Sequence, residues 1–167
     1  NQRGLAEAIW MLAQFDSIST VVKHHTRTTN TELNRVFREQ AGQNIDEAPT
    51  VQLVSDDVHS VSLLEWGDVF IDAGTSVIFE AVVRDKPILQ LEYSHWNEST
   101  VARYLPGTAV KSRDDFYNHL RTINTASTTA ELPTTYGSDE RVTFMNELIY
   151  PNGENVLESY AALLLDD

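Results

Sequence analysis

The sequence predicts an α/β fold, in which a Rossmann-like parallel sheet has helices on both faces and further helices close the domain at its C-terminal end. Short apolar and β-branched runs alternate with segments of about ten residues that carry apolar side chains at helical spacing. This alternation is typical of βαβ units, whose strands lie parallel. The length of 167 residues is enough to bury one good core.

The first half of the chain contains three predicted helices and three predicted strands. We expect helices at 4–15, 30–42 and 57–67, and strands at 19–25, 50–55 and 68–72. Asn30 or Thr31 is the expected N-cap of the second helix, and Gly42 is its expected end. Asp56 or Asp57 is expected to lead the third helix.

The second half continues the alternation and then becomes helical. We expect helices at 76–85, 97–104 and 113–123, strands at 87–92 and 108–111, and two closing helices at 141–150 and 155–165. Ser112 is the expected cap of the helix at 113–123. The chain therefore divides into a Rossmann-like part at 1–125, a polar loop at 126–139, and the C-terminal helices of the same domain at 140–167.

Composition excludes several classes of partner. The formal net charge of −13 argues against a nucleic-acid or anionic-lipid surface, since both need clusters of basic side chains. No apolar run approaches the length of a membrane span. Cysteine is absent, which excludes disulfides and fits a cytoplasmic protein. The chain lacks an initiating Met and a signal-peptide pattern, so we expect it to be a piece of a longer protein.

The stretch "DAGTSVIFE" joins a predicted strand to a predicted helix. Gly74 permits a tight turn, and the hydroxyls of Thr75 and Ser76 stand where free N–H groups and the helix dipole favour an anion such as phosphate. Glu80 shares a helix face with Ser76 and could accept hydrogen bonds from a ribose. The alternative is that Thr75 or Ser76 simply caps the helix.

The stretch "KHHTR" follows the first predicted strand. Lys23, His24, His25 and Arg27 form a cationic cluster in a chain otherwise short of positive charge, and such a cluster could neutralise a diphosphate. A solvated basic loop is the alternative. A metal site is disfavoured, because no carboxylate lies at a ligand-like spacing from the two histidines.

The run "LLEWGDVFIDAGTSVIFEAVVRDKPILQLE" resembles the signature of the C-terminal, donor-binding domain of GT-B glycosyltransferases. It is most similar to capsule-polysaccharide (Kdo) transferases and to CDP-glycerol glycerophosphotransferases. The matching positions are Trp66, Asp68, Asp72, Thr75, Ser76, Phe79, Glu80, Ala81, Lys86 and Pro87. Gly67 stands where these families have Ala, and Asp85 stands where they have Gly. "KHHTR" is similar to their Lys-Pro-His-Pro-Arg motif with both prolines replaced.

The resemblance implies that this chain binds the donor of a transferase that builds a cell-surface polysaccharide. The transferase would be cytoplasmic and would lie at the inner membrane through the rest of the protein. The implied donor is a CMP-, CDP- or UDP-linked sugar, held without a metal or other cofactor. Lys23, Arg27, Gly74, Thr75, Ser76 and Glu80 would bind the donor, and His25 would also stabilise the leaving-group phosphate. The glycan or lipid-linked acceptor would bind an N-terminal domain that is absent from this sequence, as is the strand expected just before Asn1.

Three alternatives stay open. The chain could belong to a CDP-glycerol-type polyol-phosphate transferase. It could instead be a sugar-nucleotide 2-epimerase, although the Gly pair and the second Glu of that family's turn are missing. It could also be a non-catalytic scaffold domain whose site has decayed, an interpretation favoured by the replaced prolines in "KHHTR".

Overall fold

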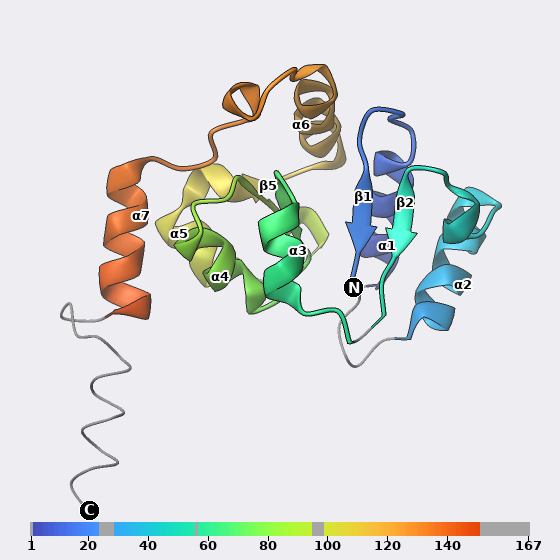
Figure 1. Ribbon diagram of the computed structural model, residues 1–167, viewed down its shortest axis with the longest axis horizontal. Coiled ribbons are helices and arrows are strands. Elements are labelled where there is room, and N and C mark those ends of the chain that lie inside the picture. The colour runs from blue at the N-terminus through green and yellow to red at the C-terminus, as the bar shows by residue number, and fades with distance from the viewer. Residues whose placement is uncertain (1, 24–28, 56, 95–98, 151–167) are drawn as a thin grey trace, which may run out of the picture.

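The computed structural model describes residues 2–23, 29–55, 57–94 and 99–150, and within them it confirms an α/β fold with parallel strands (Figure 1). The expected single sheet is divided into two, a two-stranded sheet of order β1-β2 and a three-stranded sheet of order β3-β4-β5. No strand among the described residues pairs with both β1 and β3.

The smaller sheet consists of β1 (Thr20–Val22) and β2 (Val51–Leu53), paired in parallel with Thr20 opposite Val51. Helices α1 (Gln2–Leu12) and α2 (Asn30–Ala41) pack against it. Its core cluster contains Ala6, Ile9, Val22, Leu33, Phe37, Ile45, Ala48 and Val51. The apolar positions of α2, together with Ala6 and Ile9 of α1, therefore point at this sheet, whereas Leu12 and Phe15 belong to the core of the larger sheet.

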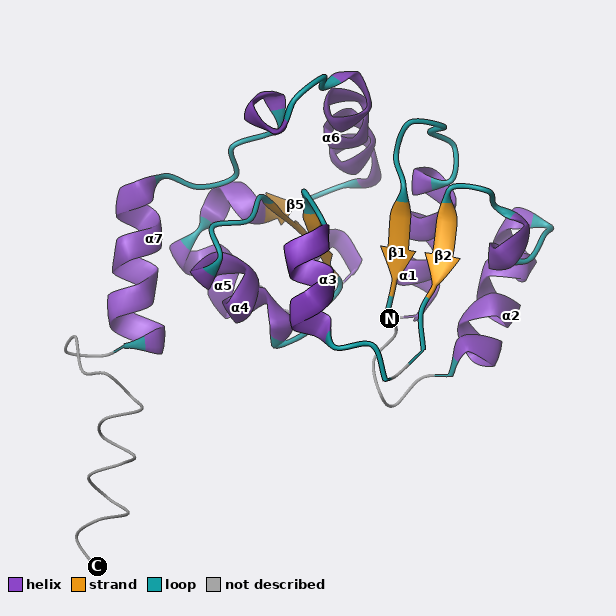
Figure 2. Cartoon of the chain, viewed as in Figure 1, coloured by secondary structure: helices purple, strands orange, loops and turns teal. Residues whose placement is uncertain are grey.

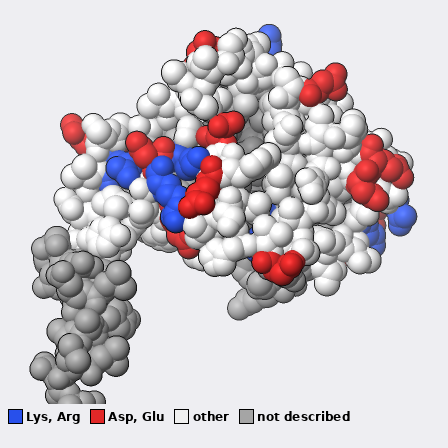
Figure 3. All heavy atoms as spheres, in the orientation of Figure 1, with Lys and Arg blue, Asp and Glu red and all other residues white. Residues whose placement is uncertain are grey.

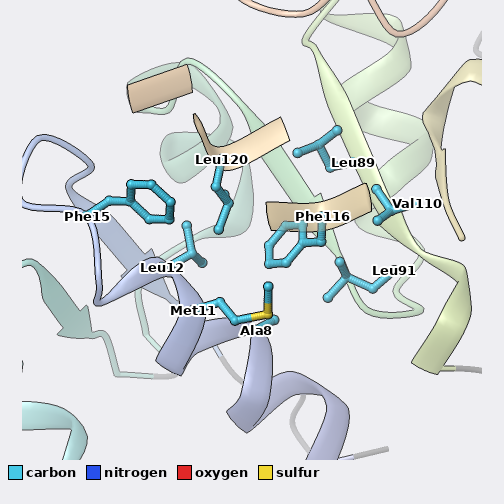
Figure 4. Packing of buried hydrophobic residues seen from close by; sticks show 9 residues of the cluster. All are labelled: Ala8, Met11, Leu12, Phe15, Leu89, Leu91, Val110, Phe116 and Leu120. Carbon is cyan, nitrogen blue, oxygen red and sulfur yellow. The ribbon is translucent and has the colours of Figure 1, made fainter. Parts of the chain in front are cut away.

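The larger sheet contains β3 (Phe70–Asp72), β4 (Ile88–Leu91) and β5 (Ala109–Val110). Helices α1 and α6 (Arg113–Thr125) contribute to the core cluster on one face, shown in Figure 4. The cluster on the other face includes residues of α3 (Ser60–Trp66), α4 (Val77–Val83), α5 (Thr100–Tyr104) and α7 (Ser138–Phe144). All four residues of β4 are buried, because it is the central strand and is covered on both sides.

Helix ends agree with the sequence in some places and correct it in others. Gly42 ends α2 in the left-handed conformation with φ of 73°, and the hydroxyl of Ser112 caps α6, as predicted. The N-cap of α2 is Thr29, whose hydroxyl accepts from the N–H of Glu32, so the prediction of Asn30 or Thr31 is wrong by one or two residues. Helix α3 begins at Ser60 with His59 as its cap, so the expectation that Asp57 leads it is wrong, and the other expected lead, Asp56, lies outside the described residues.

The reason for the late start of α3 lies in the carboxylate of Asp57. It accepts a hydrogen bond from the hydroxyl of Ser55, two residues earlier, and this local bond replaces a helix cap. Residues 57–59 therefore lie before the helix instead of forming its first turn.

The polar segment after α6 is anchored to the body of the fold at two neighbouring residues. The buried hydroxyl of Thr135 accepts from the N–H of Ile88 at 3.0 Å, and the phenol of Tyr136 donates to the carbonyl of Lys86 at 2.6 Å. The helix predicted from residue 141 begins at Ser138 and continues as a π-helix over Met145–Ile149, while the predicted helix at 155–165 lies outside the described residues. In the described part of the chain, no helix has the length and apolar character needed to cross a membrane.

Candidate functional site

The candidate site lies at the carboxyl end of β3, where the chain turns into α4. β3 ends at Asp72 and α4 begins at Val77, so the turn is short. Gly74 has φ of 96°, a conformation in which residues with a Cβ are strained, which confirms that this turn uses the freedom of glycine.

The buried carboxylate of Asp72 organises this turn. Its Oδ1 accepts from the N–H and the hydroxyl of Thr75, at 2.9 and 3.0 Å, and its Oδ2 accepts from the N–H of Gly74 at 3.1 Å. Only 1% of Asp72 is exposed. Two N–H groups that were candidates for phosphate binding therefore already donate to an anion that the protein itself supplies.

Gln90 lies beside Asp72 on the neighbouring strand β4, in register with it. Its Nε2 is 3.5 Å from Oδ2 of Asp72, and only 4% of the residue is exposed. Within the described residues its Oε1 is buried and has no hydrogen-bond donor. A buried acceptor of this kind is unusual, and it would be satisfied by a water molecule or by a ligand donor.

Neither Asp72 nor Gln90 was among the site residues predicted from the sequence. The spacing Asp-x-Gly-Thr was a usable signal for Asp72, since an Asp side chain often accepts from the N–H groups two or three residues later. Gln90 gave no such signal, because it stands in an apolar strand and its contact with Asp72 depends on strand pairing.

Ser76 and Glu80 are the exposed part of the site. Ser76 occupies the N-cap position of α4, but its side chain makes no capping hydrogen bond, so its hydroxyl is not used in the way that the cap interpretation requires. Glu80 lies one turn later on the same face and is exposed. These two side chains are presented to solvent beside the turn that Asp72 holds.

Lys23 lies at the carboxyl end of β1. Its Nζ donates to the carbonyl of Val58, so Lys23 connects the end of β1 to the segment between β2 and α3. The hydrogen bond from Ser55 lowers the pKa of Asp57, and the positive charge of Lys23 lowers it further. The other residues of the predicted cationic cluster, His24, His25 and Arg27, lie outside the described residues.

The Lys-Pro pair of the run that resembles the glycosyltransferase signature lies away from this site. Lys86 and Pro87 precede β4, at the amino end of the sheet, and Nζ of Lys86 donates to the carbonyl of Gly67 at 2.7 Å. Asp85 has φ of 54°, which accounts for the Gly found at this place in the resembled families. These residues connect α3, α4 and β4, and they have a structural role.

The surface charges are mixed. In Figure 3, basic side chains on the visible face gather over α4 and α5, with acidic side chains next to them. Among the residues that the structure describes, no group of three or more His, Asp or Glu side chains is placed to hold a metal ion.

No protein-family model, curated protein or solved structure significantly matches this chain. The fold and the site therefore define the chain as a parallel α/β domain in which the carboxylate of Asp72 holds the turn at the carboxyl end of β3.

Proposed function

We propose that this chain is the donor-nucleotide-binding domain of a GT-B glycosyltransferase that builds a cell-surface polysaccharide on the cytoplasmic side of a membrane. The observation that carries this proposal is the position of the turn at 73–76. β1 and β2 follow one another outwards in one sheet, and β3, β4 and β5 do so in the other. In open α/β sheets, ligands bind beside the carboxyl ends of the strands, and the turn at 73–76 follows the carboxyl end of β3.

The residues after β3 have chemistry suited to a nucleoside diphosphate. The exposed hydroxyl of Ser76 makes no capping hydrogen bond and can donate to a phosphate oxygen. Glu80, on the same face of α4, would accept from the ribose hydroxyls. The carboxylate of Asp72 fixes the turn so that these groups keep their positions.

The buried charge of Asp72 also has a cost for an anionic ligand, since it lies under the turn that the phosphates would approach. Cationic side chains must offset this repulsion. We assign that role to His25 and Arg27, with Lys23 at the base of the same loop, and no metal is required. As the bond between sugar and phosphate breaks, a protonated His25 would neutralise the charge that develops on the leaving nucleotide.

A CDP-glycerol-type polyol-phosphate transferase would use the same groups, and a 2-epimerase would consume its nucleotide sugar without an acceptor. A non-catalytic scaffold has one specific observation in its favour. The N–H groups of Gly74 and Thr75 are already satisfied by Asp72, so the turn is complete without a ligand.

Calorimetric titration with CMP, CDP and UDP tests donor binding directly. We expect at least one nucleotide to bind, and Ser76→Ala to weaken that binding about tenfold through the loss of a hydrogen bond to a charged phosphate. Ser127→Ala, an exposed serine in the polar segment, is the matched control and should leave the affinity unchanged. If none of the three nucleotides binds, the result would favour the non-catalytic scaffold.

A test of the role of His25 requires turnover measurements on the complete transferase with its acceptor. His25→Ala should lower turnover more than it weakens donor binding, because the imidazolium acts on charge that appears only in the transition state. Equal turnover in the variant would exclude that role. Consumption of nucleotide sugar without an acceptor would favour the epimerase.

A further inference from the structure

The ammonium group of Lys23 is bound by the chain itself. Lys23 directly follows β1, and its Nζ donates to the carbonyl of Val58, in the segment that joins β2 to α3. In Figure 2, the chain leaving β2 runs past the end of β1 on its way to α3. A hydrogen bond from a charged donor is stronger than one between neutral groups. The positive charge that the proposed donor site needs therefore already has an acceptor within the protein.

A carboxylate from the same segment adds to this contact. The hydrogen bond from the hydroxyl of Ser55 is the largest cause of the lowered pKa of Asp57, and the charge of Lys23 lowers that pKa further. The bond to Ser55 also fixes the direction of the carboxylate. Asp57 is exposed, so water weakens its attraction to the ammonium group without abolishing it. Residues 55 and 57–59, here called the pre-α3 segment, thus offer Lys23 a carbonyl and a negative charge.

The pre-α3 segment is held at both of its ends. Just before it, the N–H of Val54 donates to the carbonyl of Val22 at 3.0 Å, which extends the contact between the strands beyond β2. At the other end, Nδ1 of His59 accepts from the N–H of Val61 at 3.3 Å and caps α3. Because both ends are fixed, the segment stays beside the end of β1 in the absence of any ligand.

The pre-α3 segment presents the same kind of acceptor that a diphosphate would present to Lys23, namely oxygen atoms that carry negative charge. A ligand that uses Lys23 must first take the ammonium group from these internal partners. The observed affinity is then reduced to the extent that Lys23 is held in the free protein. A diphosphate can overcome this competition, because its charge exceeds that of one carboxylate.

We propose that the pre-α3 segment is an internal competitor for Lys23, and that a diphosphate ligand binds by taking the ammonium group from Val58 and Asp57. This inference rests on the proposed function for the identity of the ligand. It gives Asp57 a regulatory role, in which the carboxylate weakens binding. Removal of the carboxylate should therefore strengthen binding, which is the reverse of the effect expected when a ligand-binding residue is lost.

Lysine labelling without ligand tests whether Lys23 is held. The chain has three lysines, of which Lys86 is half-buried and donates to the carbonyl of Gly67 at 2.7 Å, whereas Lys111 is exposed. Limited acetylation with acetic anhydride, measured by mass spectrometry, should modify Lys23 about as slowly as Lys86 and at least about tenfold more slowly than Lys111. Equal modification of Lys23 and Lys111 would overturn the inference. This comparison uses the unsubstituted chain, so it does not depend on the folding of any variant.

A double-mutant cycle tests the competition itself. In calorimetric titration with CDP and UDP, Asp57→Asn should bind about fivefold more tightly, because the amide keeps the size of the side chain without its charge. In a chain that also carries Lys23→Met, Asp57→Asn should change the affinity by less than about twofold, since the ammonium group is no longer there to be released. Asp46→Asn, at an exposed position between α2 and β2, is the matched control and should leave the affinity unchanged.

The outcomes separate this inference from the proposed function. If CDP and UDP bind to none of these chains, the nucleoside-diphosphate ligand of the proposed function is excluded, and the inference fails with it. If they bind but Asp57→Asn leaves the affinity unchanged or weakens it, the inference alone fails. An equal gain in affinity with and without Lys23 would show that Asp57 repels the ligand directly, which also overturns the competition.

Discussion

Thr75 gives both its backbone N–H and its hydroxyl to one oxygen of Asp72, at 2.9 and 3.0 Å. The two residues thus form a closed unit across the turn between β3 and α4. This unit makes it possible to separate what stabilises the turn from what would bind a ligand there.

Asp72→Asn should lower the free energy of unfolding by about 2 kcal/mol, because the amide keeps only one acceptor oxygen and leaves buried donors unpaired. Urea denaturation measures the change. Asp68→Asn, an exposed carboxylate four residues earlier, should change stability by less than about 0.5 kcal/mol. Equal effects of the two substitutions would show that the carboxylate of Asp72 does not hold the turn.

Thr75 and Ser76 should respond differently to the loss of their hydroxyls. Thr75→Val should lower the free energy of unfolding by about 1 kcal/mol and Thr75→Ser should preserve it, because Ser keeps the bond to Asp72. Ser76→Ala should leave stability nearly unchanged and reduce nucleotide affinity in calorimetric titration. Reduced affinity with Thr75→Val at unchanged stability would reverse the two assignments.

Asp85 adopts a left-handed conformation with φ of 54°, which favours glycine. Asp85→Ala should be less stable than Asp85→Gly by about 1 kcal/mol, since both remove the contact to Arg141 and only Ala retains a Cβ. Thermal unfolding of the two variants side by side makes the comparison. If Ala were as stable as Gly, the left-handed conformation of residue 85 would be refuted.

Gly107 allows a close approach of two backbone segments. A Cβ at this position would lie 2.4 Å from the carbonyl oxygen of Thr135, so Gly107→Ala must displace the segment that anchors β4. We expect a loss of about 2 kcal/mol in the free energy of unfolding. Gly137→Ala is the control, because a Cβ there would meet only Oε2 of Glu140, at 3.7 Å.

Stability should fall in alkaline solution. Burial, with the nearby charge of Asp85, raises the pKa of Tyr136 from 10.0 to about 12, and burial, with Glu7, raises the pKa of Tyr93 to about 12. The fold therefore favours the neutral phenols. The contribution of these neutral phenols to the free energy of unfolding is fully present below the unfolded-state pKa of 10.0. It is lost as the pH rises towards 12.

Tyr136→Phe tests this dependence on pH. It should lower the free energy of unfolding by about 1 kcal/mol at neutral pH through the lost bond to the carbonyl of Lys86, and it should make the alkaline fall shallower. Urea denaturation at a series of pH values measures both changes. Tyr117→Phe, at an exposed position, should reproduce the profile of the unsubstituted chain. An unchanged slope in Tyr136→Phe would contradict the raised pKa.

The sequence predicted local features better than pairing between strands. The end of α2 at Gly42 and the cap at Ser112 depend on neighbouring residues, and both were predicted correctly. The start of α2 was misplaced because Thr29, Asn30 and Thr31 are all able to cap a helix.

The division into two sheets was not predicted, since apolar periodicity shows that a strand exists without identifying its neighbour. The contact between Asp72 and Gln90 was missed for the same reason. Of the predicted site residues, Gly74, Thr75, Ser76 and Glu80 lie together beside the turn, and Lys23 lies at the end of β1.

The bond between Ser17 and Asn124 joins residues 107 positions apart, and α1 packs against α6 over the same separation in sequence. A nascent chain cannot close this core until α6 has left the ribosome. Until then, the apolar stripe of α1 that faces Phe116 and Leu120 stays exposed. Folding of this domain should therefore be slow for its size and should depend on protection of its first helix during synthesis.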